Sequence, residues 1–104
     1  MIVVDTSLIY ALLDAADRRH RQAVGWYRRV DDELVTTPLV LAEANHLAST
    51  RLGPRAAKAL RSDIRAGAYS VEWWPGAASA AAEVADRYAE LGVGLVDASL
   101  VVLA

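Results

Sequence analysis

Three short segments rich in β-branched and aromatic residues alternate along this chain with segments of helical character. They cover residues 2–4, 34–36 and 69–74, and their length and composition predict short buried strands. Strands that are separated by helices are joined by crossover connections, which make neighbouring strands parallel. The sequence therefore predicts an α/β domain in which a short parallel sheet is flanked by helices.

Helices are expected between and after these strands because apolar residues recur there at intervals of three and four positions. Thr37-Pro38 is typical of a cap followed by the first helical residue, and Gly53-Pro54 separates that helix from the next one. Asp17 is a candidate N-cap for the second helix. The expected helices cover residues 7–14, 17–30, 38–52, 55–66, 77–91 and 96–104.

Length and composition limit the class of protein. The 104 residues have the size of a single domain (1–104), and 55% hydrophobic with 23% charged residues predicts a globular fold. No apolar run is long enough for a transmembrane helix, so no membrane association is expected. The absence of cysteine excludes disulfides and thiolate catalysis and, without a signal peptide, indicates a cytoplasmic protein. With a net charge of −2, nucleic-acid binding would need a local basic patch.

Three carboxylates interrupt otherwise apolar segments. Asp5 directly follows the first strand, at the strand end where α/β proteins form their sites. Glu43 shares a helix face with Leu39 and Leu47. Asp97 has apolar neighbours near the start of the last helix. Buried carboxylates are costly and repel one another, and a hard cation relieves both problems. We therefore expect the three groups to converge within coordination reach of Mg²⁺ or Mn²⁺.

Each of these acids also has a structural interpretation when it is taken alone. Asp5 and Asp97 are residues that commonly cap helices, and Glu43 could form an ion pair with an arginine. The metal-site interpretation depends on all three acids together in a strand–helix pattern.

Histidine and basic residues supply further candidates. His20 and His46 are in no zinc-binding pattern, so structural or surface roles are expected for them. Lys58, Arg61 and Arg65 follow i, i+3, i+7 spacing and form one basic helix face. That face is either a phosphate-contact surface for RNA or a solvated face.

The tryptophans have two possible roles. Trp26, Trp73 and Trp74 could stack on nucleic-acid bases. The alternation of apolar residues in 69–74 predicts instead that at least one tryptophan belongs to the core.

Three stretches carry a family resemblance. VDTSLIYALLD, TTPLVLAEANHLAS and GVGLVDASLVVLA resemble, in order and spacing, successive motifs of PIN-domain proteins, in particular the VapC-type toxins of bacterial toxin–antitoxin pairs. The resemblance implies a PIN-like fold and an Mg²⁺- or Mn²⁺-dependent endoribonuclease, the toxin of a type II system. It also implies an RNA substrate, a cognate antitoxin and a homodimer. By resemblance, Asp5, Glu43 and Asp97 bind the metal and act in catalysis, and Thr6 or Ser7 orients a carboxylate or a bound water.

The end of the chain departs from the family pattern. PIN nucleases usually carry a fourth acid after a further strand, whereas this sequence stops at Ala104. We therefore expect that the domain lacks its last strands and that the native protein has about 25–35 further residues, by analogy with single-domain sizes. The main alternative is a catalytically silent PIN-like module that only binds a protein partner. A receiver-like phosphoryl-transfer domain is a weaker alternative, because no second acid accompanies Asp5.

Overall fold

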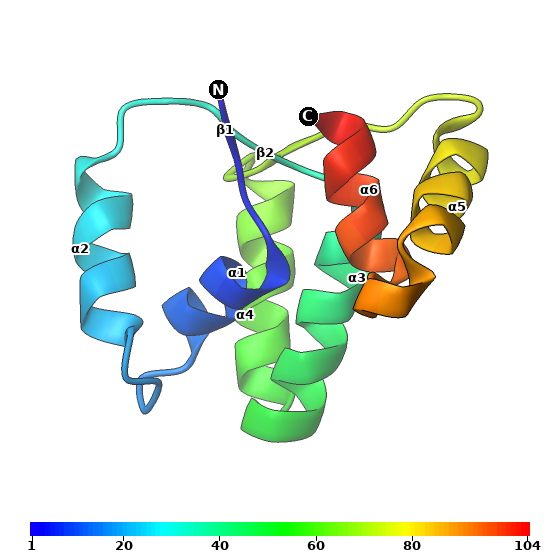
Figure 1. Ribbon diagram of the computed structural model, residues 1–104. Coiled ribbons are helices and arrows are strands. Elements are labelled where there is room, and N and C mark those ends of the chain that lie inside the picture. Colours follow the sequence, from blue (N-terminus) through cyan, green and yellow to red (C-terminus); the bar gives the residue numbers. More distant parts are fainter.

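The computed structural model describes residues 1–104 as helices packed around a three-stranded parallel sheet (Figure 1). The strand order β1-β2-β3 leaves β2 in the centre and β1 at an edge. The strands are β1 (Ile2–Val3), β2 (Leu34–Thr36) and β3 (Ser70–Val71). The predicted α/β class and parallel sheet are confirmed, although β3 is shorter than the predicted segment 69–74.

All six predicted helices are present, with ends that differ by a few residues. They are α1 (Thr6–Leu13), α2 (His20–Arg29), α3 (Pro38–Leu47), α4 (Pro54–Arg65), α5 (Ala77–Arg87) and α6 (Leu95–Leu103). A π-helical turn at Ala48–Leu52 extends α3, and a 3-10 turn at Ala89–Leu91 follows α5. None of the helices has the length and apolar character needed to cross a bilayer.

The predicted N-cap of α2 is wrong. Arg19 occupies that position and makes no capping hydrogen bond through its side chain. Asp17 instead accepts a hydrogen bond of 2.8 Å from the backbone N–H of Arg19, within the turn that precedes the helix. The carboxylate therefore stabilises the turn rather than the first turn of α2.

One hydrophobic core joins the sheet to α1, α3 and α4. Helix α2 packs on α1 at one end of the molecule, and α5 and α6 pack together at the other end, where α6 also contacts α3 (Figure 1). The core cluster consists of Val4, Ile9, Leu34, Val40, Leu41, Ala44, Leu60 and Tyr69. The ends of β1, α3 and α6 are thereby brought to the same region of the molecule.

Buried hydroxyl groups fix the start of α3 against α6. The Oγ atoms of Thr37 and Ser99 lie 2.8 Å apart, and both residues are fully buried. Ser99 Oγ donates to the carbonyl of Val96 at 2.6 Å, so the shared proton comes from Thr37. Thr37 in turn caps α3 by accepting from the N–H of Val40. This chain of hydrogen bonds sets the position of α6 relative to α3.

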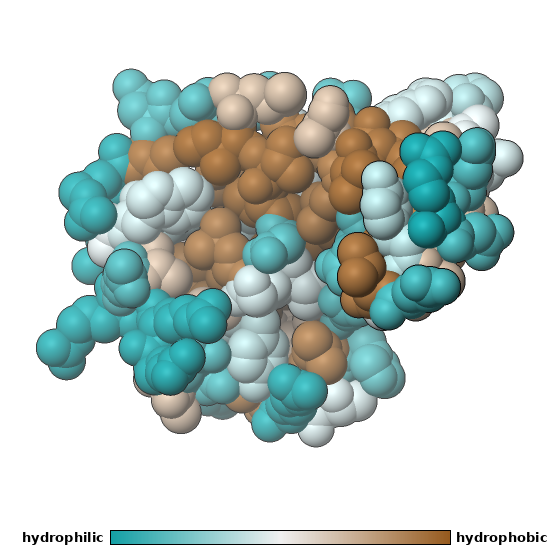
Figure 2. Space-filling model, in the orientation of Figure 1, coloured by the Kyte–Doolittle hydropathy of each residue, from teal (hydrophilic) through white to brown (hydrophobic).

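One face of the molecule exposes apolar side chains. Figure 2 shows such residues gathered over β1 and α6, and Val3, Leu95 and Val101 are exposed there. The outer edge of β1 has no neighbouring strand. An exposed strand edge beside an apolar surface is a typical site of contact with another chain.

Candidate functional site

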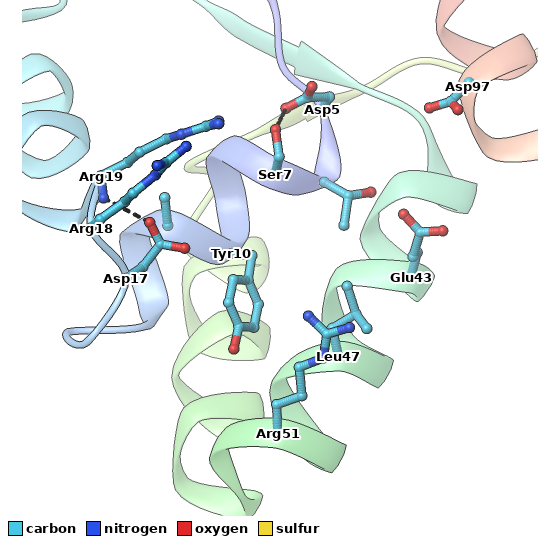
Figure 3. A pocket seen from close by; sticks show the side chains of 12 residues that line it. Asp5, Ser7, Tyr10, Asp17, Arg18, Arg19, Glu43, Leu47, Arg51 and Asp97 are labelled. Atoms are coloured by element: carbon cyan, nitrogen blue, oxygen red, sulfur yellow. Dashed lines mark hydrogen bonds between the residues drawn. The ribbon is translucent and has the colours of Figure 1, made fainter.

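A cavity of about 480 Å³ opens beside α1, α3 and the start of α6 (Figure 3). Twelve residues line it, and all three carboxylates singled out in the sequence are among them. Asp5 comes from the end of β1, Glu43 from the middle of α3, and Asp97 from the first turn of α6. The fold therefore brings together acids that are far apart in the sequence, and we call this space the carboxylate cavity.

The Asp5 side chain is held by hydrogen bonds at the start of α1. Its Oδ1 atom accepts from the backbone N–H of Leu8 at 3.0 Å and from the hydroxyl of Ser7 at 2.9 Å. Asp5 is thus the N-cap of α1, which confirms its structural interpretation. Its Oδ2 atom has no hydrogen-bond partner within the protein. Capping therefore orients the carboxylate and leaves one oxygen available to a ligand.

Glu43 and Asp97 have no protein partner. Neither carboxylate takes part in the two ion pairs of the structure or in a side-chain hydrogen bond, so the alternative in which Glu43 pairs with an arginine is wrong. The alternative in which Asp97 caps the last helix is also wrong, because Gly94 occupies the N-cap of α6. Asp97 lies in the first turn, where the helix dipole favours a negative charge.

The three carboxylates are more exposed than the sequence predicted. All three residues are exposed rather than buried. No group of three or more histidine, aspartate or glutamate side chains is arranged closely enough to hold a metal ion by itself. The three carboxylates line one cavity, and their convergence around one ion stays a prediction.

The donor set nevertheless fits a hard divalent cation. Carboxylate oxygens are the ligands that Mg²⁺ and Mn²⁺ prefer, and Mg²⁺ usually keeps several waters while binding one or two carboxylates. Thr6 also lines the cavity, and its Oγ1 atom is buried without a hydrogen-bond partner. Buried hydroxyls are normally paired, so this atom points to a water or ligand at the site.

Three arginines line the same cavity, and the sequence analysis missed them. Arg18 and Arg19 extend from the segment before α2, and Arg51 lies on the far side beside Tyr10 (Figure 3). Positions 39, 43, 47 and 51 continue one helix face, so the spacing from Glu43 could have identified Arg51. No local pattern distinguishes Arg18 and Arg19 from the other arginines of the chain.

Arg51 and Tyr10 form a pair within the cavity wall. The guanidinium carbon of Arg51 lies 5.7 Å from the centre of the Tyr10 ring, within the range of a cation–π contact. Burial and the nearby Asp14 raise the pKa of the Tyr10 phenol, and Arg51 opposes this shift. Both residues line the carboxylate cavity.

The basic face on α4 lies outside the cavity. Lys58, Arg61 and Arg65 are exposed and line none of the pockets. Arg61 donates a 3.0 Å hydrogen bond to Oδ1 of Asn45. The structure therefore keeps these three cations apart from the three carboxylates.

One histidine and one tryptophan contact the interior of the protein, and the others lie at its surface. His20 bonds through Nδ1 to the carbonyl of Ala11 at 2.7 Å, so its predicted structural role is confirmed, and His46 is exposed. Trp26 packs partly against the core but is not buried in it, so the core tryptophan predicted from the alternation in 69–74 is absent. Trp73 and Trp74 are exposed after β3.

Three comparisons relate this chain to known proteins. The PIN domain family model matches residues 2–104. Ribonuclease VapC26 of Mycobacterium tuberculosis is 34% identical over 105 residues, which cover 99% of this chain and 77% of that protein. The crystal structure of Mycobacterium tuberculosis VapC20, a sarcin-ricin loop cleaving toxin, matches with a TM-score of 0.89 and 32% identity, covering 99% of this chain and 80% of that one. The chain therefore belongs to the PIN-domain family and is of the VapC type.

Proposed function

We propose that this chain is a metal-dependent endoribonuclease that hydrolyses RNA phosphodiester bonds at the carboxylate cavity, and that it is the toxin of a type II toxin–antitoxin system. The observation that carries the proposal is that Asp5, Glu43 and Asp97 line one cavity and form no ion pair with the protein. The similarity to a ribonuclease and to a toxin that cleaves an RNA loop supports RNA as the substrate.

In this proposal the three carboxylates bind Mg²⁺ or Mn²⁺. When bound there, the ion would supply positive charge for the scissile phosphate and would lower the pKa of the attacking water. Ser7 holds the Asp5 carboxylate in orientation, and the unpaired hydroxyl of Thr6 positions a water. Glu43, which has no protein partner, accepts the proton of the attacking water.

The arginines of the cavity complete the proposed substrate site. A guanidinium group binds phosphate oxygens through paired hydrogen bonds and keeps its charge at any physiological pH. We assign Arg18, Arg19 and Arg51 to phosphates of the RNA chain. The basic face of α4, formed by Lys58, Arg61 and Arg65, is proposed as a weaker contact to more distant phosphates.

We propose protein partners as well. A cognate antitoxin would hold the toxin inactive, and the toxin would be a homodimer that acts in the cytoplasm. The single core cluster supports the treatment of residues 1–104 as one domain.

One observation favours a second candidate, a catalytically silent PIN-like module that binds a protein partner. The three carboxylates do not form a compact metal-binding group. Such a module would bind Mn²⁺ very weakly, whereas a nuclease needs the ion.

An RNA cleavage assay tests the proposed activity. Purified protein should cut a labelled single-stranded RNA in the presence of Mg²⁺ or Mn²⁺ and should stop when a chelator is added. Asp97→Asn removes the charge with little change in volume and should abolish cutting. Asp86→Asn, an exposed acid on α5 that lines no cavity, is the matched control and should cut normally. Equal cutting by both variants would contradict the proposal.

A further inference from the structure

A second cavity, of about 320 Å³, lies between α1 and α2. Its lining residues are Ser7, Leu8, Ala11, Arg19, Gln22, Ala23, Trp26 and Arg29. Half of them are apolar, the polar ones include two arginines, and none carries a carboxylate. The second cavity is therefore positively charged, whereas the carboxylate cavity contains four acids, Asp17 included, beside its three arginines.

The two cavities adjoin each other. Ser7, Ala11 and Arg19 line both of them, and Ser7 is the residue that holds Asp5. A chain molecule with one group at the carboxylates can therefore place its next group in the second cavity without leaving the surface. Arg19 lies at the boundary, where it can meet a negative charge between the two groups.

The walls of the second cavity are held in place. His20 of α2 donates a hydrogen bond of 2.7 Å to the carbonyl of Ala11 in α1, which fixes the spacing of the two helices. Trp26 packs partly against the hydrophobic core, so its ring cannot move freely. A preformed cavity binds with little loss of conformational entropy.

We propose that this second cavity binds an unpaired nucleobase of the RNA strand, next to the phosphate that is cut. A nucleobase has apolar faces and a polar edge, which match the Trp26 ring and the Gln22 amide, a group that both donates and accepts hydrogen bonds. Arg19 and Arg29 bind the phosphates that flank this nucleotide. The inference rests on the proposed ribonuclease function and gives it a base-binding subsite. The absence of carboxylates and the position next to the carboxylate cavity favour RNA over a peptide as the occupant.

The test compares two RNA probes in the Asp97→Asn protein, which should bind without cutting. One is a fluorescent single-stranded 12-mer of mixed sequence, and the other is an abasic 12-mer with the same ribose–phosphate backbone. Removing a stacking aromatic from a single-strand site weakens binding by about 5- to 100-fold. Trp26→Leu should therefore weaken binding of the intact 12-mer by that factor and leave binding of the abasic 12-mer unchanged.

Variants on the exposed side of α2 keep the test independent of folding. Gln22→Ala should weaken binding of the intact 12-mer severalfold and leave the abasic 12-mer unaffected. Arg29→Gln should weaken both probes, because it removes a phosphate contact. Arg21→Gln, on the same helix but outside every cavity, is the matched control and should weaken neither probe more than slightly.

The intrinsic fluorescence of Trp26 gives a direct readout. In a Trp73→Phe, Trp74→Phe background it is the only remaining tryptophan, and the intact 12-mer should quench it while the abasic 12-mer should not. The base site is refuted if the ratio of the affinities for the intact and the abasic 12-mer is the same in Trp26→Leu, Gln22→Ala and the parent protein. It is also refuted if a partner peptide quenches the fluorescence of Trp26 and RNA does not. Because the readout is binding, failure of the base site is distinguishable from failure of RNA cutting in the parent chain.

Discussion

The carboxylate cavity and the basic face of α4 carry opposite charges and are built in different ways. Asp5, Glu43 and Asp97 come from separate elements, and hydrogen bonds fix these elements: Asp5 caps α1, and the Thr37–Ser99 pair connects α3 with α6. The basic face comes from successive turns of one exposed helix, and only Arg61 has a protein partner there. Function at the cavity should therefore depend on distant structural contacts, whereas the α4 face should act only through its charge.

The largest expected effect on the cavity side comes from the charge of Asp5. Asn caps helices about as well as Asp, so Asp5→Asn should keep the stability of α1. It should lower the RNA cleavage rate by about 100-fold or more, as removal of one group that stabilises the transition state does. Asp5→Ala should lose the same activity and also about 1 kcal/mol of unfolding free energy, because the cap is removed.

Cleavage kinetics and denaturant unfolding of these two variants separate charge from capping. If Asp5→Asn retains the parent cleavage rate, Asp5 is a helix cap and nothing more. If Asp5→Ala and Asp5→Asn unfold at the same denaturant concentration, the capping role is the part that is wrong.

The second largest effect is expected when the buried contact that sets the position of Asp97 is removed. Thr37→Val removes the hydroxyl between Val40 N–H and Ser99 Oγ. An unsatisfied buried polar group costs about 1–3 kcal/mol of unfolding free energy, and the cleavage rate should fall as α6 shifts against α3. The measurement is urea unfolding together with cleavage kinetics.

Thr50→Val is the matched control for this substitution. The Thr50 hydroxyl donates to the carbonyl of His46 in an exposed turn, and exposed substitutions usually change stability by less than about 0.5 kcal/mol. Equal stability losses in the two variants would show that the buried Thr37–Ser99 contact contributes no more to the free energy of unfolding than the exposed hydrogen bond of Thr50.

A smaller effect is expected from Arg51, which belongs to the cavity although it is a surface cation. Arg51→Gln should weaken RNA binding by about 2- to 10-fold, as the loss of one hydrogen bond worth about 0.5–1.5 kcal/mol predicts. It should also lower the salt slope of binding by about 0.7, the value for one phosphate contact to a single strand. Arg55→Gln, an exposed residue on α4 that lines no cavity, is the control. Equal salt slopes for the two variants would remove Arg51 from the substrate site.

The smallest effect on the cleavage rate is expected from the α4 face. Replacing Lys58, Arg61 and Arg65 together by Gln should weaken RNA binding and lower the salt slope by up to about 2, as the loss of three single-strand phosphate contacts predicts. Mn²⁺ affinity and the rate at saturating RNA should not change. The measurement is a salt titration of RNA binding, and an unaltered slope would identify this face as solvated surface.

Local sequence signals predicted much of the fold. The Thr37-Pro38 pair marked the start of α3, and β-branched runs marked the strands. Asp5 and Asp97 were identified because charge interrupts apolar segments. These features depend on residues that are close together along the chain, so they can be predicted from a single sequence.

Features that depend on tertiary packing could not be predicted in the same way. The spacing of Glu43 from Asp97 is set by the packing of α6 on α3, which no local pattern encodes. Arg18 and Arg19 reach the cavity only because α2 packs on α1. The Arg19 cap of α2 was missed because Asp17 has the better intrinsic propensity but serves the preceding turn.

Mn²⁺ binding tests the central claim most directly. Isothermal titration should be carried out on the parent protein, on a cavity variant (Asp5→Asn, Glu43→Gln, Asp97→Asn), and on a control with three exposed acids neutralised elsewhere (Glu72→Gln, Asp86→Asn, Glu90→Gln). The account predicts that the parent and the control bind Mn²⁺ equally well and that the cavity variant loses affinity by at least about tenfold, as metal sites do when their ligands are disturbed. Equal Mn²⁺ affinity in all three proteins would contradict the claim that the carboxylate cavity is the metal centre.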